Sequence, residues 1–354
     1  MNQQDKIVLG ISIGDLNGIG SEIILKTFED NRILDFCTPV IFASVKLMSF
    51  YKKTYETDIN FHGIENINDV LPKKVNVLNV WKEPVEINFG KEDKASGAYA
   101  IKSLQAAVSA LKSNKIDVLV TAPIHKANIQ SETFKFPGHT DYLARELEGE
   151  SMMLMISEKL RVGLLTDHVP VKDVSKTITR ELIEKKIITI HKTLIQDFGI
   201  ERPKIAVLSI NPHVGDNGVI GDEDDTVLIP TLDNLRKNGK IVYGPYAADS
   251  FFGSGNYKNF DAIIAAYHDQ GLVPFKTIAF GTGVNYTAGL NKIRTSPDHG
   301  TAFDVAGKNV ANADSFKEAV FSAIEIFKTR KEYLEISKNP LSTTRRKVLS
   351  KKKQ

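Results

Sequence analysis

Short apolar segments alternate with amphipathic helical segments along most of this 354-residue chain, and this rhythm limits the folds it can adopt. Residues 6–13 form an apolar run, and a helical pattern starts at Gly20 or Ser21. Residues 95–111 place apolar side chains at helical spacing and lead into the apolar run 117–120. The same alternation predicts strands at 39–43, 75–80 and 204–210, and helices at 179–198 and 316–328. We therefore predict an α/β fold with a largely parallel sheet and helices on both faces.

Composition and charge narrow the class of protein. Hydrophobic residues make up 42% of the chain and charged residues 25%, as in ordinary globular proteins of one large or two smaller domains. The formal net charge of +3 is too small to favour a nucleic-acid partner. Much of the basic excess lies in residues 345–353, where we expect a solvated terminus, with polyanion binding as the alternative.

The single cysteine, Cys37, excludes an intrachain disulfide and fits a reducing compartment. The first six residues do not resemble a cleavable signal, and no apolar run approaches the roughly 20 residues that span a bilayer. We expect a cytoplasmic protein with no membrane partner.

Three of the eight histidines follow apolar strand-like runs. They are His168 after residues 162–165, His213 after 207–210, and His268 after 262–266. Ligands of open α/β sheets bind at the carboxyl ends of strands, and neutral imidazole is a common ligand of divalent ions. One such histidine is more often an ordinary hydrogen-bonded residue, but three in the same setting favour a metal site. Three imidazoles favour zinc or cobalt, and nearby carboxylates admit magnesium.

Long stretches of chain separate these histidines, so a folded sheet would have to bring them together. Gly271 predicts a turn directly after His268. Asp249 and Asp269 are candidate acid–base groups or partners that orient a ligating histidine. We favour Asp249, because neighbours in an extended chain, such as His268 and Asp269, point apart.

Several motifs follow one another in an order typical of one family. They are residues 14–20 (GDLNGIG), 121–126 (TAPIHK), 137–141 (PGHTD), 211–213 (NPH), 244–249 (GPYAAD) and the region 267–307. In this order they resemble the 4-hydroxythreonine-4-phosphate dehydrogenases of pyridoxal phosphate (vitamin B6) biosynthesis, over residues 7–326. Leu16, Asn17 and Ser21 replace a proline, an alanine and a second proline of the family's opening loop, so we expect the turn to be kept with less rigidity.

The resemblance implies a two-domain fold like that of isocitrate and isopropylmalate dehydrogenases, and not a Rossmann domain. The first domain would comprise residues 1–125 and 285–354, the second 126–284, with the active-site cleft between them. In agreement, no Gly-x-Gly-x-x-Gly follows the first predicted strand. The dinucleotide loop would be 298–307, with His299, Gly300 and Asp304 binding NAD or NADP. The alternative for this loop is a glycine-containing turn before a helix.

The reaction implied by the resemblance is an oxidation followed by a decarboxylation. NAD would oxidise 4-phosphooxy-L-threonine to 2-amino-3-oxo-4-phosphooxybutanoate, which loses carbon dioxide to give 3-amino-2-oxopropyl phosphate. A divalent cation would stabilise the developing alkoxide as a Lewis acid. His168, His213 and His268 would hold this cation, with His168 donated by the partner subunit of a homodimer that shares its active sites.

The resemblance also assigns the substrate-binding residues His139, Thr140, Lys276, Asn285 and Arg294. Without it, the last three would be unrelated surface residues, and Thr140 would be a helix cap. Lys126 is a candidate proton relay, with a phosphate contact or a structural contact as the alternatives.

Three other functions stay open on the sequence. The first is a dehydrogenase of a four-carbon sugar-acid phosphate, such as threonate or erythronate 4-phosphate. The second is a metal-dependent hydrolase or lyase that uses no dinucleotide, and the third is a non-catalytic metabolite-binding protein. Reduction of NAD by phosphorylated four-carbon hydroxy acids, with and without a chelator, separates these classes.

Overall fold

The computed structural model describes residues 6–132, 134–136 and 138–339. The basic tail and Pro137 of the 137–141 motif therefore lie outside the described residues. In the described part, the strands form one sheet in the order β3-β4-β2-β1-β5-β12-β11-β6-β7-β10-β8-β9. The strands are β1 (Ile7–Ser12), β2 (Cys37–Ala43), β3 (Phe61–Ile64), β4 (Val75–Asn79), β5 (Val118–Thr121), β6 (Gly149–Ile156), β7 (Arg161–Leu164), β8 (Ile205–Leu208), β9 (Val242–Tyr246), β10 (Ala262–Ala265), β11 (Val284–Leu290) and β12 (Ile293–Pro297).

The sheet is largely parallel, as the alternating pattern predicts. Antiparallel pairing is confined to the centre, where β11 pairs with β12 and β6, and β6 pairs with β7. Interior strands such as β2, β5, β8 and β10 are buried along their whole length, which is typical of strands covered by helices on both faces.

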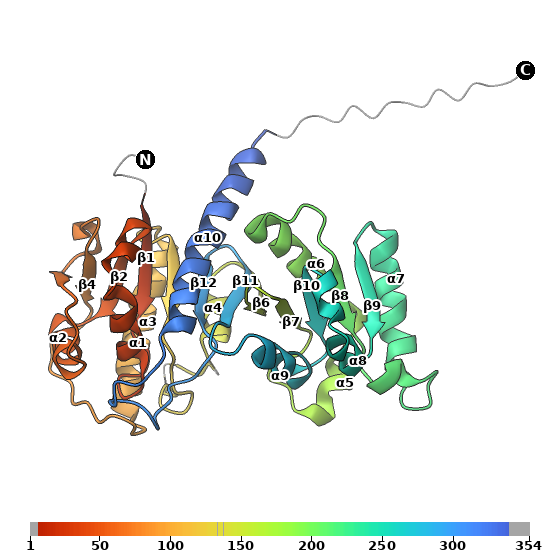
Figure 1. Cartoon of the computed structure of the whole chain (residues 1–354), viewed down its shortest axis with the longest axis horizontal. Helices are drawn as coiled ribbons and strands as arrows, with labels where there is room; N and C mark the ends of the chain where they lie inside the picture. The colour runs from red at the N-terminus through yellow and green to blue at the C-terminus, as the bar shows by residue number, and fades with distance from the viewer. Residues whose placement is uncertain (1–5, 133, 137, 340–354) are drawn as a thin grey trace, which may run out of the picture.

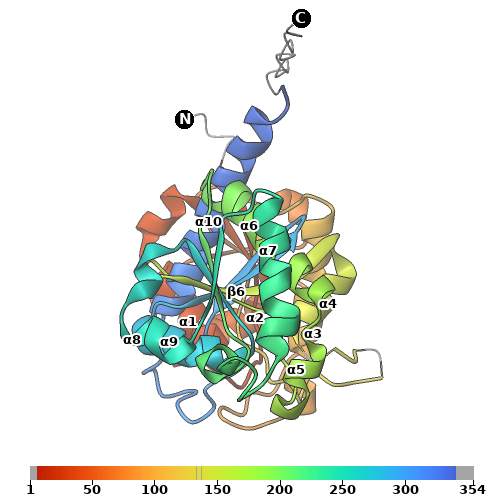
Figure 2. The same cartoon turned by 90° about the vertical axis from the view of Figure 1, so that its right-hand side faces the viewer.

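Helices cover both faces of this sheet (Figures 1 and 2). Helices α1, α6, α7 and α10 pack on one face of the strands, and α3, α4, α8 and α9 pack on the other. The helices are α1 (Gly20–Phe28), α2 (Val45–Thr54), α3 (Lys94–Lys112), α4 (His139–Glu146), α5 (Val174–Thr177), α6 (Arg180–Phe198), α7 (Ile229–Lys237), α8 (Ala248–Gly253), α9 (His268–Ile278) and α10 (Asp314–Ile336). None of the helices in the described part of the chain is long and apolar enough to cross a bilayer.

Local signals account for several helix ends. The Asp93 carboxylate accepts hydrogen bonds from the amides of Ala95 and Ser96 and so caps α3. The Thr179 hydroxyl caps α6 in the same way, and Gly199, with a φ of 67°, ends that helix in the left-handed conformation.

The prediction of a turn at Gly271 is wrong, because Gly271 lies inside α9. A Cβ built on this residue would lie 2.9 Å from side-chain atoms of Val162, Leu164 and Ala265. Glycine therefore allows the helix to approach β7 and β10 closely, and its role here is packing and not chain reversal.

Two halves of the sheet meet at the β11–β12 pair (Figure 1). Strands β1 to β5 form one half, and β6 to β10 form the other. The chain returns to the centre with β11 and β12, which join β6 and β5 respectively. The predicted domain boundaries, 1–125 with 285–354 and 126–284, stay a prediction. The return of the chain brings the site candidates Asn285, on β11, and Arg294, on β12, to the centre of the sheet.

A buried ionic network fastens α10 across this junction. The Arg330 guanidinium donates hydrogen bonds to the Asp197 carboxylate at 2.6 and 2.9 Å and to the Tyr286 hydroxyl at 2.7 Å. Tyr286 also donates to Asp197 at 2.6 Å. Helix α10 is thus tied to α6 and β11, beyond its apolar packing on the sheet.

Candidate functional site

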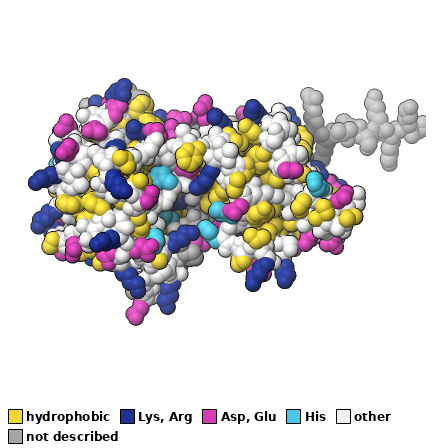
Figure 3. Space-filling view, turned by 60° about the horizontal axis from the view of Figure 1, so that its bottom comes forward, with side chains coloured by type: hydrophobic (Ala, Val, Ile, Leu, Met, Phe, Trp, Pro, Cys, Tyr) yellow, Lys and Arg dark blue, Asp and Glu magenta, His cyan; other side chains and the backbone are white. Residues whose placement is uncertain are grey.

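A pocket of about 280 Å³ opens between the two halves of the molecule. Figure 3 shows the hollow, with histidine and cationic side chains around it. Ten of the residues predicted for the site line this pocket: Lys126, His139, Thr140, His168, His268, Lys276, Asn285, Arg294, His299 and Gly300. The structure therefore brings together residues that are far apart in the sequence. His213, Asp249, Asp269 and Asp304 do not line it.

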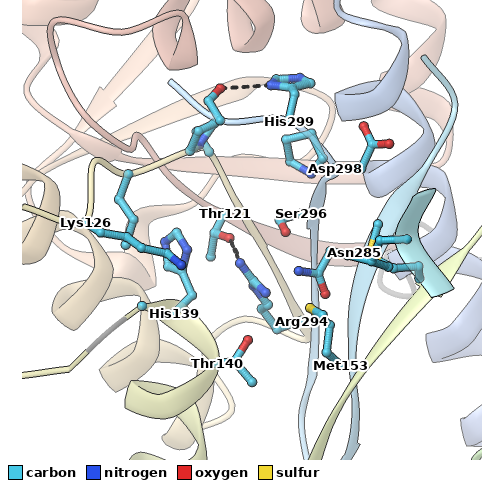
Figure 4. Close-up of a pocket in the computed structure, with 18 of the residues that line it drawn as sticks. Thr121, Lys126, His139, Thr140, Met153, Asn285, Arg294, Ser296, Asp298 and His299 are labelled. Atoms are coloured by element: carbon cyan, nitrogen blue, oxygen red, sulfur yellow. Dashed lines mark hydrogen bonds between the residues drawn. The ribbon is translucent and has the colours of Figure 1, made fainter. Parts of the chain in front are cut away.

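Arg294 forms the floor of the pocket (Figure 4). It lies on β12 and is only 2% exposed. Its guanidinium donates to the Thr121 hydroxyl at 3.0 and 2.5 Å and to the Thr287 hydroxyl at 3.2 Å. No carboxylate in the described part of the chain forms an ion pair with it. Burial lowers the pKa of Arg294 to about 9. A buried cation held only by neutral hydroxyls is a site for an anionic ligand.

Polar atoms without partners surround Arg294. The His139 Nε2 atom and the Asn285 Oδ1 atom are buried and have no hydrogen-bond partner in the described structure. Burial, together with the positive charge of Arg294, holds the pKa of His139 well below its usual range, so its imidazole is neutral near pH 7. Buried polar groups are usually hydrogen-bonded, so these atoms indicate a polar ligand in the pocket.

The alternative role of Thr140 as a helix cap is not observed. The residue that caps α4 is Gly138, and no side chain makes a capping hydrogen bond there. His139 and Thr140 are instead the first two residues of the helix, and both line the pocket. Lys276 lies near the end of α9, and its ammonium donates to the Asp298 carbonyl at 2.9 Å.

Two of the three predicted metal ligands lie close together. His168 follows β7, His268 begins α9 after β10, and their ring centroids are 6.1 Å apart. The Lys126 Nζ atom is 3.4 Å from the His168 Nε2 atom. His213 follows β8 in the short helical turn Pro212–Gly215, where it is exposed. Within the described residues of one chain, no three His, Cys, Asp or Glu side chains are placed to hold a metal ion.

Asp269 contacts His268 directly, contrary to the argument from an extended chain. The His268 Nδ1 atom and the Asp269 Oδ1 atom are 2.7 Å apart. Both residues lie in the first turn of a helix, where neighbouring side chains can meet at their tips. This contact leaves Nε2 of His268 free to face a ligand. Asp249, which the sequence favoured, is exposed on the short helix α8.

The predicted dinucleotide loop reaches the pocket at one end only. His299 and Gly300 line the pocket, and the His299 Nε2 atom is buried without a partner. Asp304 is exposed further along the loop. The Ile19 amide donates to the Thr301 carbonyl at 3.0 Å, so the opening loop 14–20 supports this segment.

The opening loop is well anchored at Asn17, one of its three replaced positions. This residue is fully buried, and its amide group donates to the Lys91 carbonyl at 3.0 Å and accepts from the Asn88 amide at 2.8 Å. Asn17 therefore ties the loop to residues 88–91.

Sequence analysis missed Thr121 and Thr287 as functional residues. Both are fully buried on strands and hold the Arg294 guanidinium. The available signal was weak, because a threonine in an apolar strand is common in any sheet.

Comparisons with known proteins identify relatives of this chain. The family model described as "Pyridoxal phosphate biosynthetic protein PdxA" matches residues 35–323. A 4-hydroxythreonine-4-phosphate dehydrogenase of Bacteroides thetaiotaomicron is 46% identical over 341 residues, which cover 96% of this chain and 94% of the relative. A D-threonate 4-phosphate dehydrogenase of Cupriavidus necator is 36% identical over 324 residues, which cover 90% of this chain and 97% of the relative.

Solved structures show the same fold. The crystal structure of a 4-hydroxythreonine-4-phosphate dehydrogenase from Klebsiella pneumoniae superimposes with a TM-score of 0.79 and 30% identity, and covers 92% of this chain and 99% of that structure. The predicted α/β fold is thus confirmed.

Proposed function

Because this chain belongs to the PdxA family of pyridoxal phosphate biosynthetic proteins, we propose that it oxidises 4-phosphooxy-L-threonine with NAD. The product, 2-amino-3-oxo-4-phosphooxybutanoate, is a β-keto acid. It loses carbon dioxide to give 3-amino-2-oxopropyl phosphate.

The observation that carries this proposal is the unpaired guanidinium of Arg294 at the floor of the pocket. A phosphate monoester supplies the negative charge that this buried cation lacks, and arginine can bind its oxygens through two parallel hydrogen bonds. His139, Thr140, Lys276 and Asn285 line the same pocket and offer further hydrogen bonds to the substrate. We assign these five residues to substrate binding.

The residues at the pocket mouth fit a nicotinamide cofactor. We assign His299 and Gly300 to its binding, with Asp304 further along the loop. The His299 Nε2 atom is buried without a partner among the described residues, and apart from the two chain neighbours of Gly300 no described residue lies within 4 Å of a Cβ built there. The bound cofactor would take up the hydride from the substrate alcohol carbon. We propose NAD and leave NADP as the alternative that cofactor assays would reveal.

The histidines fit a divalent cation of the zinc, cobalt or magnesium type. We assign His168, His213 and His268 as its ligands, and the Asp269 carboxylate fixes the ring of His268 for this role. The cation would supply Lewis-acid stabilisation of the alkoxide. The described residues of one chain contain no complete ligand set, and this supports a homodimer in which two subunits share each site. We propose a cytoplasmic location for this homodimer.

Lys126 is our candidate for moving the alcohol proton. Its Nζ atom lies beside His168. From there the neutral amine would accept the hydroxyl proton, and the ammonium so formed would later give a proton to the carbon that loses carbon dioxide. Asp269 would act through His268. Asp249 is exposed and does not line the pocket of its own chain, so we favour it less than Lys126 as a catalytic residue.

A substrate panel tests the proposal. We expect purified protein to reduce NAD with 4-phosphooxy-L-threonine, and to lose this activity in the presence of a chelator. Activity restored by zinc, cobalt or magnesium would identify the cation. Metal-dependent hydrolysis or cleavage without reduction of NAD would contradict the proposal and favour a hydrolase or lyase.

A second substrate is supported by the relative from Cupriavidus necator, whose name specifies D-threonate 4-phosphate. That compound shares the four-carbon chain and the phosphate, and differs at the substrate's amino group. The same panel should include D-threonate and D-erythronate 4-phosphates, and the highest kcat/KM decides between the substrates.

A further inference from the structure

Six consecutive residues after β8 have positive φ angles. These angles are 52° at His213, 58° at Val214, 78° at Gly215, 46° at Asp216, 55° at Asn217 and 85° at Gly218. Only two of the six are glycines, and the β-branched Val214 is especially unfavourable in this conformation. A strained run of this length persists only where the surrounding structure enforces it.

The carboxylate of Asp224 holds the chain just before this run. It is fully buried and accepts hydrogen bonds from the amides of Ile210 at 2.8 Å and Asn211 at 2.9 Å. These amides lie immediately before the left-handed run. The Asn211 side chain also donates to the Glu223 carboxylate at 2.7 Å, so both ends of the loop are clamped together.

The left-handed run is packed as well as clamped. A Cβ built on Gly215 would lie 2.2 Å from the Gly221 carbonyl oxygen, so only glycine fits there. The Ile220 amide donates to the Gly215 carbonyl at 3.0 Å, and the Asp216 amide donates to the His213 carbonyl at 3.2 Å. The run is therefore a defined turn.

Gln270 connects this turn to the helix that starts with His268. Its side chain donates to the Ser209 carbonyl at 2.8 Å and accepts from the Ala266 amide at 2.7 Å. The Ser209 hydroxyl donates in turn to the Asn211 carbonyl at 2.7 Å. The chain segments that carry His213 and His268 are thus held in a fixed relation.

We propose that Asp224 is a positioning residue, which holds residues 213–218 in the left-handed turn and so presents the exposed His213 imidazole to the cation before the cation binds. This inference rests on the proposed metal site. Asp224 does not touch the cation; it acts through the amides of residues 210 and 211. The strain in the turn is the cost of having a ligand ready in place.

A matched pair of variants tests the role of Asp224, with Co²⁺ alone as the probe. We expect Asp224→Asn to weaken Co²⁺ binding about 10- to 100-fold, as for other residues that orient metal ligands, and to change the visible absorbance of the bound ion. Asp225→Asn removes the same charge from the exposed neighbouring residue and should bind Co²⁺ like the wild type. Circular dichroism checks that both variants fold. Wild-type Co²⁺ binding by a folded Asp224→Asn protein would overturn the proposal.

A second pair of variants, at Val214, tests the turn itself. This test can be made even if the Asp224→Asn protein does not fold. Proline fixes φ near −65°, so Val214→Pro cannot adopt the left-handed conformation, whereas Val214→Gly adopts it freely. We expect Val214→Pro to lose Co²⁺ affinity by a similar factor and Val214→Gly to keep it within about threefold, a fold-change well below that expected from a displaced ligand. Equal affinities of the two variants would show that the turn does not position a ligand.

The variant His213→Ala distinguishes a failure of the proposed metal site from a failure of the positioning role of Asp224. If this variant binds Co²⁺ like the wild type, the proposed metal site is wrong, and the role of Asp224 falls with it. If it binds weakly while Asp224→Asn and Val214→Pro bind normally, the metal site stands and the positioning role alone is refuted.

Discussion

At the scale of single residues, the decisive feature is a buried cation that lacks a counter-charge. Arg294 is held by two threonine hydroxyls, and burial lowers its pKa to about 9. Elsewhere in the same chain, the buried Arg330 is paired with Asp197. The contrast separates a structural arginine from one that awaits a ligand, because an unpaired buried charge is costly to keep.

We predict that Arg294→Met raises the KM for the phosphorylated substrate at least tenfold, because a charged hydrogen bond contributes roughly 1.5–3 kcal/mol. The KM for NAD should not change. The Tm of the free protein should not fall, because the variant removes an uncompensated buried charge. Steady-state kinetics and thermal unfolding measure these effects.

Arg202→Met is the control for this prediction, because it removes the same charge from an exposed position. It should leave both Michaelis constants unaltered. An Arg294→Met enzyme with wild-type KM and kcat would remove Arg294 from the binding site.

At the scale of elements, α9 determines much of the site. It begins at His268, contributes Lys276 near its end, and approaches the sheet through Gly271. Its first turn also brings Asp269 to His268. The position of one helix therefore sets a proposed metal ligand, the carboxylate that orients it and a proposed phosphate contact.

We predict that Gly271→Val lowers the free energy of unfolding by about 1–3 kcal/mol, because added methyl groups would overlap with Val162, Leu164 and Ala265. It should also weaken Co²⁺ binding, because α9 carries His268. Denaturant unfolding and metal titration measure both effects.

The glycine of α8 provides a matched comparison. Beyond the backbone of its own helix and its chain neighbours, no described residue lies within 4 Å of a Cβ built on Gly253, so Gly253→Ala should stabilise the protein by about 0.4–1 kcal/mol. A Gly271→Val protein as stable as the wild type would mean that α9 can move without cost.

At the scale of the whole molecule, the pocket depends on the meeting of two halves. Arg294 and Thr121 come from one half, and His168 and His268 come from the other. One chain leaves His213 outside the pocket, which is why we propose that a second subunit completes the ligand set. The family resemblance implies that His168 is the donated ligand.

Pairwise mixing of His168→Ala, His213→Ala and His268→Ala chains under subunit exchange tests this arrangement. A heterodimer regains one intact site only if its two defects lie in ligands from different subunits. We expect activity and bound metal to return in both mixtures that contain the donated histidine, and not in the third. Mass spectrometry verifies the exchange. No recovery in any mixture would place all three ligands within one chain.

Much of this fold follows from the sequence, for a physical reason. The alternation of buried strands and amphipathic helices is local, because strand and helix periods can be read within a few turns of chain. The helices predicted at 95–111 and 179–198 correspond to α3 and α6 within a few residues. The position of His168 after a strand is likewise a local property.

Only the tertiary structure decided what depends on packing between distant segments. Gly271 looked like a turn, yet it is a helix residue selected by the side chains of β7 and β10. Asp269 looked unable to reach His268, yet a helical turn joins them. The sequence by itself determined the α/β architecture and the chemical types at the strand ends. Contacts between residues far apart in the chain decide which of these groups are buried or paired, and why Arg294 has no counter-charge among the described residues. Local periodicity carries no information about such contacts.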